Sequence, residues 1–296
     1  MRASDVMQHQ MTTPAVRGLD VALGGVRGTM AVSDRHRTAA GTNHQGGDLG
    51  HHASPDLVVR HTVNYLLAAD IAAGVTIDGP LLDVGSGVGV FATWLARRLE
   101  RPLHLADHDP AVLDLARRAF PALTAHADLA DAPRAAVVTA MEVIEHIPYR
   151  DQTAFVRDVM SHVQPGGALI CSTPDERRYL GGWSGYAPHI GTLDFTGLTS
   201  LLRHATGLPV HVWRIDGPGF TLGRLQRVAE PVANRLWGFA QRRAPALTGR
   251  LAGGVGGRRR RSNTFTPAPA ETAFRVTTDP DGLGTGLLAA VFQPTG

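Results

Sequence analysis

Residues 81–91 have the sequence LLDVGSGVGVF, and this stretch decides the predicted fold. Its first four residues suit a short buried strand, its three glycines suit a turn, and an apolar helix follows from residue 90. A glycine-rich turn between a strand and a helix directs backbone N–H groups and a helix N-terminus toward a ligand. A Cβ would oppose the close backbone approach and the positive φ angles of such a turn. The stretch therefore predicts a site for a nucleotide-like ligand.

The composition is typical of a soluble globular protein. The chain has 296 residues, 43% of them hydrophobic and 6% aromatic, with Cys171 as its one cysteine. A single cysteine excludes an intramolecular disulfide and a cysteine-based zinc cluster, and it fits a reducing compartment. The sequence has no apolar run of about 18 residues that would span a membrane, and its N-terminus lacks the pattern of a signal peptide. We therefore expect a cytoplasmic location.

All 29 basic residues are arginine. Together with abundant alanine and glycine, this bias indicates a GC-rich genome and a bacterial source. The formal net charge of +3 is modest for this length and does not call for a nucleic-acid partner.

Strands and helices alternate through the middle of the chain, beginning with a helix over residues 55–73. Strands are predicted at 81–84, 103–106, 123–127, 136–140, 168–172, 210–215 and 287–292. Strands this apolar, joined by helices, favour an α/β fold whose mostly parallel sheet is covered by helices on both faces.

Four segments follow from this pattern. We expect a disordered N-terminal segment over 1–53, a core over 54–217, an insertion over 218–283 and a final strand within 284–296. The insertion contains an arginine-rich amphipathic helix over 222–243 that Pro231 should kink or restart, and a glycine-, arginine- and proline-rich stretch over 253–269 that we expect to be mobile.

The glycine spacing separates two classes of nucleotide site. The dinucleotide pattern is G-x-G-x-x-G, whereas this loop is G-x-G-x-G and has Val90 where that pattern needs its third glycine. This difference argues against an NAD-dependent oxidoreductase. Asp107 stands eighteen residues past Gly89, at the end of the second strand, where a carboxylate can accept hydrogen bonds from ribose hydroxyls. Asp128 follows the third strand, where a carboxylate could meet an adenine amino group.

Five sequence pieces occur in one order along the chain. They are DVGSGVG at 83–89, ADHDP at 106–110, ADL at 127–129, MEVIEH at 141–146, and VQPGG at 163–167 followed by CSTP at 171–174. In this combination the chain resembles the class I S-adenosylmethionine-dependent methyltransferases. The resemblance implies a Rossmann-like seven-stranded sheet of order 3-2-1-4-5-7-6 with an antiparallel seventh strand, which residues 287–292 would supply.

The resemblance also implies roles for individual residues. The glycine loop would wrap the methionine part of S-adenosyl-L-methionine, Asp107 would hold the ribose, Asp128 and Leu129 would flank the adenine, and Met141 would line the methyl-donor end. Asp83 would brace the loop. The full set expected to bind the cofactor is Asp83, Gly85, Ser86, Gly87, Gly89, Asp107, His108, Asp128, Leu129 and Met141.

The reaction expected is an in-line transfer of an already activated methyl group, for which the enzyme supplies proximity and orientation. A hydroxyl acceptor would need a base, and His146 is our candidate because it follows the fourth strand and has a suitable ordinary pKa. Glu142 and Glu145 are the other candidate catalytic residues. The alternative for His146 is a structural role at the start of a helix.

Glu142, Glu145 and His146 form an E-x-x-E-H motif. It resembles the quinone-biosynthesis O-methyltransferases and the small-RNA 2′-O-methyltransferases, in some of which these side chains hold a divalent cation. Such a cation, Mg²⁺ here, would acidify an acceptor hydroxyl, and His189 would be a further ligand. Metal-free relatives carry a similar motif, so a metal-free site stays open. The aromatic-rich motif of the RNA enzymes is not matched, which makes RNA the less favoured acceptor.

The acceptor is expected near the loop after the fifth strand, where Trp183, Tyr186 and His189 suit a planar or lipophilic molecule. Packing of these side chains in a lid is the alternative. The helix over 222–243 could contact an anionic membrane surface, close over the acceptor, or be an ordinary surface helix.

We therefore predict O-methylation of a small, lipid-like or secondary-metabolite acceptor. A metal-dependent RNA 2′-O-methyltransferase or a non-catalytic cofactor-binding protein remain the alternatives, and the sequence does not predict the oligomeric state.

Overall fold

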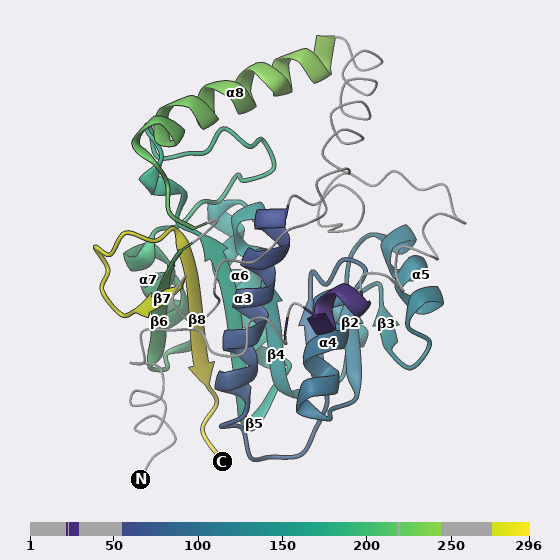
Figure 1. The fold of residues 1–296 in the computed structure, drawn as a ribbon. Coiled ribbons are helices and arrows are strands. Elements are labelled where there is room, and N and C mark those ends of the chain that lie inside the picture. Colours follow the sequence, from purple (N-terminus) through teal and green to yellow (C-terminus); the bar gives the residue numbers. More distant parts are fainter. Residues whose placement is uncertain (1–21, 23, 30–54, 218–219, 244–273) are drawn as a thin grey trace.

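The structure is a computed structural model, and it describes residues 22, 24–29, 55–217, 220–243 and 274–296 (Figure 1). Its centre is an eight-stranded sheet of order β3-β2-β1-β4-β5-β8-β6-β7. The strands are β1 Leu81–Val84, β2 Leu103–Ala106, β3 Thr124–His126, β4 Ala135–Met141, β5 Val163–Pro174, β6 Val210–Asp216, β7 Arg275–Thr277 and β8 Gly286–Phe292.

The topology confirms the predicted fold class. Strands β1 to β5 pair in parallel, and β8 inserts antiparallel between β5 and β6. The first seven positions of the sheet therefore match the expected order, and the last strand of the chain, β8, lies sixth along the sheet, where the antiparallel seventh strand was expected. The eighth strand, β7, lies at the edge beside β6 and was not predicted; it falls within residues 218–283, which were expected to be an insertion.

Helices cover both faces of the sheet. They are α3 Pro55–Ala72, α4 Val90–Leu99, α5 Pro110–Ala119, α6 Tyr149–Ser161, α7 Phe195–Thr206 and α8 Arg224–Arg243, with short 3₁₀ helices η1 Leu129–Asp131, η2 Ile144–His146 and η3 Glu176–Arg178. Helix α3 begins at Pro55 as predicted. None of the helices in the described ranges is long and apolar enough to cross a membrane.

Two hydrophobic clusters lie on opposite faces of the sheet. Val137 belongs to the cluster under α3, α4 and α5, whereas the next residue, Val138, belongs to the cluster under α6 and α7. Successive side chains of a strand point to opposite faces, so a strand buried on both faces must be apolar at every position. This is why β4 could be recognised as a continuous apolar run.

The N-terminal segment differs in part from the expected disorder. Residues 22 and 24–29 are helical, Ala22 and Val26 are buried in the core, and the helix approaches α4 closely enough that a Cβ on Gly25 would lie 2.6 Å from the Trp94 ring. The remainder of 1–53 and the stretch 253–269 lie outside the described residues.

Candidate functional site

The glycine loop joins β1 to α4 at the carboxyl edge of the parallel strands. Gly85, Gly87 and Gly89 have φ angles of 68°, 54° and 74°. A Cβ on Gly85 would lie 2.5 Å from Val143, and a Cβ on Gly89 would lie 2.5 Å from Leu105. Glycine is therefore needed at both positions for the backbone conformation and for packing against Val143, which follows β4, and Leu105 on β2.

Asp107 connects this loop to the end of β2. Its Oδ2 accepts a hydrogen bond from the backbone N–H of Gly87 at 2.9 Å, and its Oδ1 accepts one from the N–H of Asp109 at 3.0 Å. Each carboxylate oxygen keeps a second lone pair, so Asp107 is fixed in place and still able to accept hydrogen bonds from ribose hydroxyls. The neighbouring His108 side chain is fully exposed, with Nδ1 3.5 Å from Asp107.

Asp83 lies deeper than the loop. Its carboxylate accepts hydrogen bonds from the Tyr65 hydroxyl on α3 and the Thr139 hydroxyl on β4. Burial raises the pKa of Asp83 to about 7, although the hydrogen bonds from Thr139 and Tyr65 act in the opposite direction. Among the described residues the hydrogen-bond partners of its side chain lie on α3 and β4, and bracing of the loop by Asp83 stays a prediction.

The other predicted cofactor residues lie along the same edge of the sheet. Asp128 is exposed and caps η1 by accepting a hydrogen bond from the N–H of Ala130 at 3.0 Å, and the half-buried Leu129 packs beside it. Met141 is the buried last residue of β4, and the Ser86 hydroxyl donates to the carbonyl of Gly87 at 3.3 Å. The carboxyl ends of neighbouring parallel strands meet at this edge, which is where ligands bind in open α/β sheets.

Glu142 follows β4 in a left-handed backbone conformation, with φ 56°. Its side chain forms an ion pair with Arg60 of α3 at 2.8 Å and accepts hydrogen bonds from Asn64 at 3.2 Å and Ser172 at 3.0 Å. Burial alone would raise the pKa of Glu142, but Arg60 and the other nearby donors hold it below its ordinary value. Glu142 is therefore engaged with α3 and β5, and its predicted metal or catalytic role stays a prediction.

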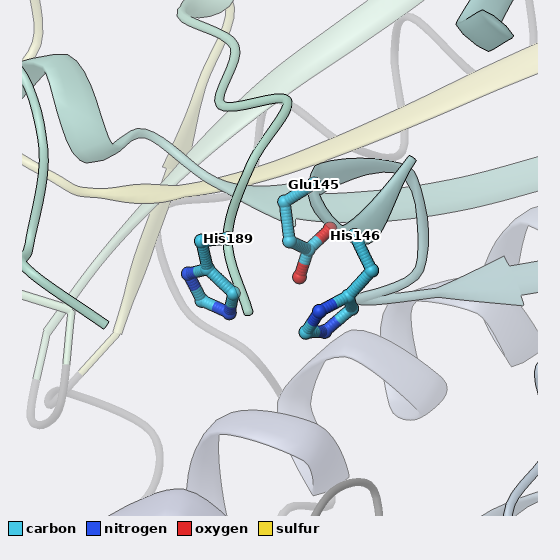
Figure 2. Close-up of side chains that lie close together, drawn as sticks. All are labelled: Glu145, His146 and His189. Atoms are coloured by element: carbon cyan, nitrogen blue, oxygen red, sulfur yellow. The ribbon is translucent and has the colours of Figure 1, made fainter. Parts of the chain in front are cut away.

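The other two residues of the motif meet His189. One ligand atom each of Glu145, His146 and His189 lies within 4.8 Å of the others, and Figure 2 shows the three side chains turned toward one another. The Glu145 side chain is completely buried, and its Oε2 accepts a hydrogen bond from Thr173 at 3.0 Å, while Oε1 has no hydrogen-bond partner among the described residues. Burial and the nearby Glu142 raise the pKa of Glu145 well above its ordinary value.

Each histidine of this cluster is oriented through Nδ1. The His146 Nδ1 lies 3.1 Å from the carbonyl oxygen of Pro188, which only accepts, so Nδ1 carries the proton and Nε2 is left as the base. Burial, followed by the nearby His189, lowers the pKa of His146. The His189 Nδ1 lies 2.5 Å from Oε1 of the buried Glu176, and the two imidazole rings meet edge-on at 4.8 Å.

The two aromatic residues of the following loop have different surroundings. Tyr186 meets the His189 ring edge-on at 4.8 Å and is 43% exposed, so it borders the histidine cluster. The Trp183 ring instead packs under the guanidinium of Arg235 on α8, 5.4 Å from ring centre to Cζ. The loop thus places Tyr186 and His189 at the cluster and uses Trp183 to contact α8.

Sequence reasoning missed Glu176 and Arg60. Glu176 stands in the charged run DERR, which has the appearance of an ordinary exposed turn, and Arg60 lies on a helix far from any motif. Their partners stand 13 and 82 residues away along the chain. No local pattern signals contacts at that separation.

Comparison with known proteins identifies the family. Residues 51–211, more than half of the chain, match the model of a methyltransferase domain. A curated protein from Mycolicibacterium smegmatis, described as a probable S-adenosylmethionine-dependent methyltransferase, is 32% identical over 155 residues, which are 49% of this chain and 57% of that protein. The match therefore spans a little over half of the length of that relative.

Solved structures of methyltransferases are also similar. An S-adenosylmethionine-dependent methyltransferase from Thermotoga maritima is 12% identical with a TM-score of 0.47, covering 79% of this chain and 92% of its own. An amino pentose methyltransferase from Micromonospora echinaspora is 26% identical with a TM-score of 0.34, covering 38% and 50%. With the family model, the sheet order and the glycine loop joined to Asp107, the chain belongs to the methyltransferase-domain family, and within it to the class I S-adenosylmethionine-dependent methyltransferases.

Proposed function

We propose that this protein methylates a hydroxyl group of a small, lipid-like or secondary-metabolite molecule, with His146 as the general base. The observation that carries the proposal is the orientation of His146 at the edge of the sheet where β4 ends: its Nδ1 lies against the Pro188 carbonyl, which leaves Nε2 as the basic nitrogen. Bound S-adenosylmethionine supplies an electrophilic methyl group, so the protein itself must hold the reactants and accept one proton.

In this proposal the glycine loop and Asp107 bind the cofactor. The loop offers backbone N–H groups and a helix N-terminus at the end of β1, and Asp107 offers fixed carboxylate oxygens at the end of β2. Asp128 and Leu129 follow β3 on the same side. Residues 128 and 129 fit an adenine-binding role, in which the Asp128 carboxylate keeps free lone pairs after capping η1.

His146 and its neighbours would bind the acceptor and take up its proton. A neutral imidazole is the form that accepts a proton, and the lowered pKa of His146 favours that form at neutral pH. The Glu176–His189 pair borders the same space and fixes the second imidazole. Tyr186 adds a partly exposed aromatic ring, which supports a planar or lipophilic acceptor.

The second candidate function is a metal-dependent methyl transfer, in which Glu145, His146 and His189 hold a divalent cation. The support is their convergence and the Oε1 of the buried Glu145, which has no partner within the described part of the chain and which a cation would satisfy. Two imidazoles and a carboxylate suit several divalent metals, and Mg²⁺ or Mn²⁺ would act by acidifying the acceptor hydroxyl. This arrangement is also the one that the RNA-methylating alternative would need.

Substitution of His146 tests the proposal. We expect His146→Ala to lower turnover at least about 100-fold, because a positioned base contributes roughly that much, with little change in S-adenosylmethionine affinity. Release of S-adenosylhomocysteine over a panel of hydroxylated small molecules measures turnover, and calorimetry measures affinity. His204→Ala, on the exposed side of α7, is the matched control and should change neither quantity.

The same assays separate the alternatives. Unchanged turnover in His146→Ala would remove the base assignment. Activity that a chelator abolishes and Mg²⁺ or Mn²⁺ restores would favour the metal site. Methylation of an RNA 3′ end in place of the small molecules would favour the RNA alternative, and cofactor binding without turnover on either class would favour a non-catalytic protein.

A further inference from the structure

We propose that α8 docks this protein on the surface of an anionic phospholipid membrane. The helix spans Arg224–Arg243 and lies beyond the carboxyl edge of the sheet, projecting past the rest of the described chain (Figure 1). Five of its large apolar side chains are about half or more exposed, with Leu225 reaching 86%. They are Leu225, Val228, Val232, Leu236 and Phe239.

These five side chains form one continuous face. Successive helical residues are rotated by about 100°, so positions 225, 228, 232, 236 and 239 fall within an arc of about 80°. A stripe of this width is what an amphipathic helix ordinarily buries against a protein core. Here it is exposed along the whole length of the helix.

The opposite, more polar face is the one packed on the protein. The amide of Asn234 donates to the carbonyl of Ser184 at 2.9 Å, and the N–H of Leu180 donates to the carbonyl of Arg227 at 3.0 Å. Pro231 is buried against Gly185, where an added Cβ would lie 2.6 Å from the Pro231 carbonyl oxygen. These contacts fix the rotation of α8, so the apolar stripe faces outward because the helix is held in that orientation.

Positive charge accompanies the apolar face. Arg224 stands along one border of the stripe, Arg235 stands beside it with its guanidinium over the Trp183 ring, and the exposed Arg243 stands at the C-terminal end. The acidic residue of the helix, Glu230, is on the packed side. Residues 224–243 contain five arginines and one glutamate, whereas the whole chain has a net charge of only +3, so positive charge is concentrated on α8.

The charge and the apolar area of α8 together indicate which kind of partner it binds. An apolar stripe bordered by arginines matches an anionic lipid surface, where the apolar side chains enter the boundary of the acyl chains and the guanidinium groups meet phosphates. A second copy of this chain would bring the same arginines to the contact, so self-association through this face would place like charges together.

The test is a vesicle flotation assay with the full chain. We expect the protein to float with vesicles made of equal parts phosphatidylcholine and phosphatidylglycerol, to stay unbound with phosphatidylcholine alone, and to bind less as salt rises. Leu225→Asp combined with Leu236→Asp should weaken binding at least about tenfold, because two large apolar groups leave the lipid contact.

Gln226→Asp combined with Ala233→Asp is the matched control. Gln226 and Ala233 are both exposed on α8 and lie outside the stripe. Their substitution adds the same two negative charges without interrupting the stripe, so this variant should keep most of the binding. Calorimetry with S-adenosylmethionine shows that each variant is folded and also keeps this test separate from the proposed methylation.

Three outcomes would overturn the proposal. They are a wild-type protein that fails to float with the anionic vesicles, equal binding to both vesicle types, and equal losses in the two double variants. A wild-type dimer in sedimentation velocity that Leu225→Asp with Leu236→Asp converts to a monomer, without any vesicle binding, would assign the stripe to a second copy of the chain.

Discussion

The two halves of the candidate site are built in different ways. The cofactor half consists of the glycine loop and Asp107, and its hydrogen bonds join a carboxylate to backbone N–H groups no more than 20 residues apart. The acceptor half consists of Glu145, His146, His189 and Glu176, whose side chains are oriented by partners as far as 42 residues away.

In the cofactor half the orientation of the ligand-binding groups is fixed by local backbone geometry, whereas in the acceptor half it depends on the packing of a loop. Backbone N–H groups at a β–α turn point at a ligand whatever the surrounding side chains are, provided that glycine permits the turn. The imidazoles of the acceptor half keep their orientation only while the loop containing Pro188 and His189 stays packed. We therefore expect changes in the first half to act on cofactor affinity and folding, and changes in the second to act on local order and turnover.

The largest effect is expected for Asp107→Ala. It removes a carboxylate that holds the Gly87 N–H and would hold the ribose, and hydrogen bonds to a charged group contribute about 1.5–3 kcal/mol each, so S-adenosylmethionine affinity should fall roughly 1000-fold. Calorimetry measures the change. Asp114→Ala, which loses only an exposed ion pair with Arg117 on α5, should leave affinity unchanged. Equal affinities in the two variants would show that the cofactor half does not depend on Asp107.

A smaller effect is expected for Gly89→Ala, compared with Gly207→Ala. Both glycines have φ near 70°, but a Cβ at position 89 meets Leu105 at 2.5 Å, whereas a Cβ at position 207 meets nothing within 4 Å. The shared backbone strain costs about 1 kcal/mol, and the added overpacking at Gly89 about 1–2 kcal/mol more. Chemical denaturation measures both variants. A Gly207→Ala variant as unstable as Gly89→Ala would mean that packing against β2 contributes nothing.

The smallest effect is expected for Glu176→Gln in the acceptor half. The Oε2 of Glu176 accepts the N–H of Ser184 at 3.2 Å and its Oε1 pairs with His189, so the substitution keeps one acceptor oxygen and loses the charge. Amide hydrogen exchange over residues 184–191 should accelerate at least about tenfold, since one charge-assisted bond of about 1.5 kcal/mol is lost. Exchange in the glycine loop should not change. Acceleration in both regions would show that the two halves are not independent.

Some features of the fold and the candidate site could be predicted from the sequence, and others could not. The order of the first seven sheet positions and the loop conformation were predicted, because buried strands and glycine turns have local signals. The ion pair of Glu142 with Arg60 on α3 was not predicted, and the metal-ligand role of Glu142 stays a prediction. The motif spacing places Glu142 close to Glu145 along the chain but contains no information about the side on which each side chain points.

The helix α8 shows the same limit. Its amphipathic pattern was evident in the sequence, and an ordinary helix with that pattern would bury the apolar stripe. Contacts of Asn234, Arg227 and Pro231 with the loop over 180–185 give it the opposite rotation. Which face of an amphipathic helix is buried depends on its neighbours in space.

The sequence by itself determined the fold class, the glycine loop, and the carboxylate that meets it, because each rests on short-range backbone geometry or on the continuous hydrophobicity of buried strands. Only the tertiary structure decided that Glu145, His146 and His189 converge while Glu142 does not, and that α8 turns its apolar stripe outward. Those outcomes depend on side-chain hydrogen bonds between distant segments, and their geometry exists only once the sheet has brought the loops together.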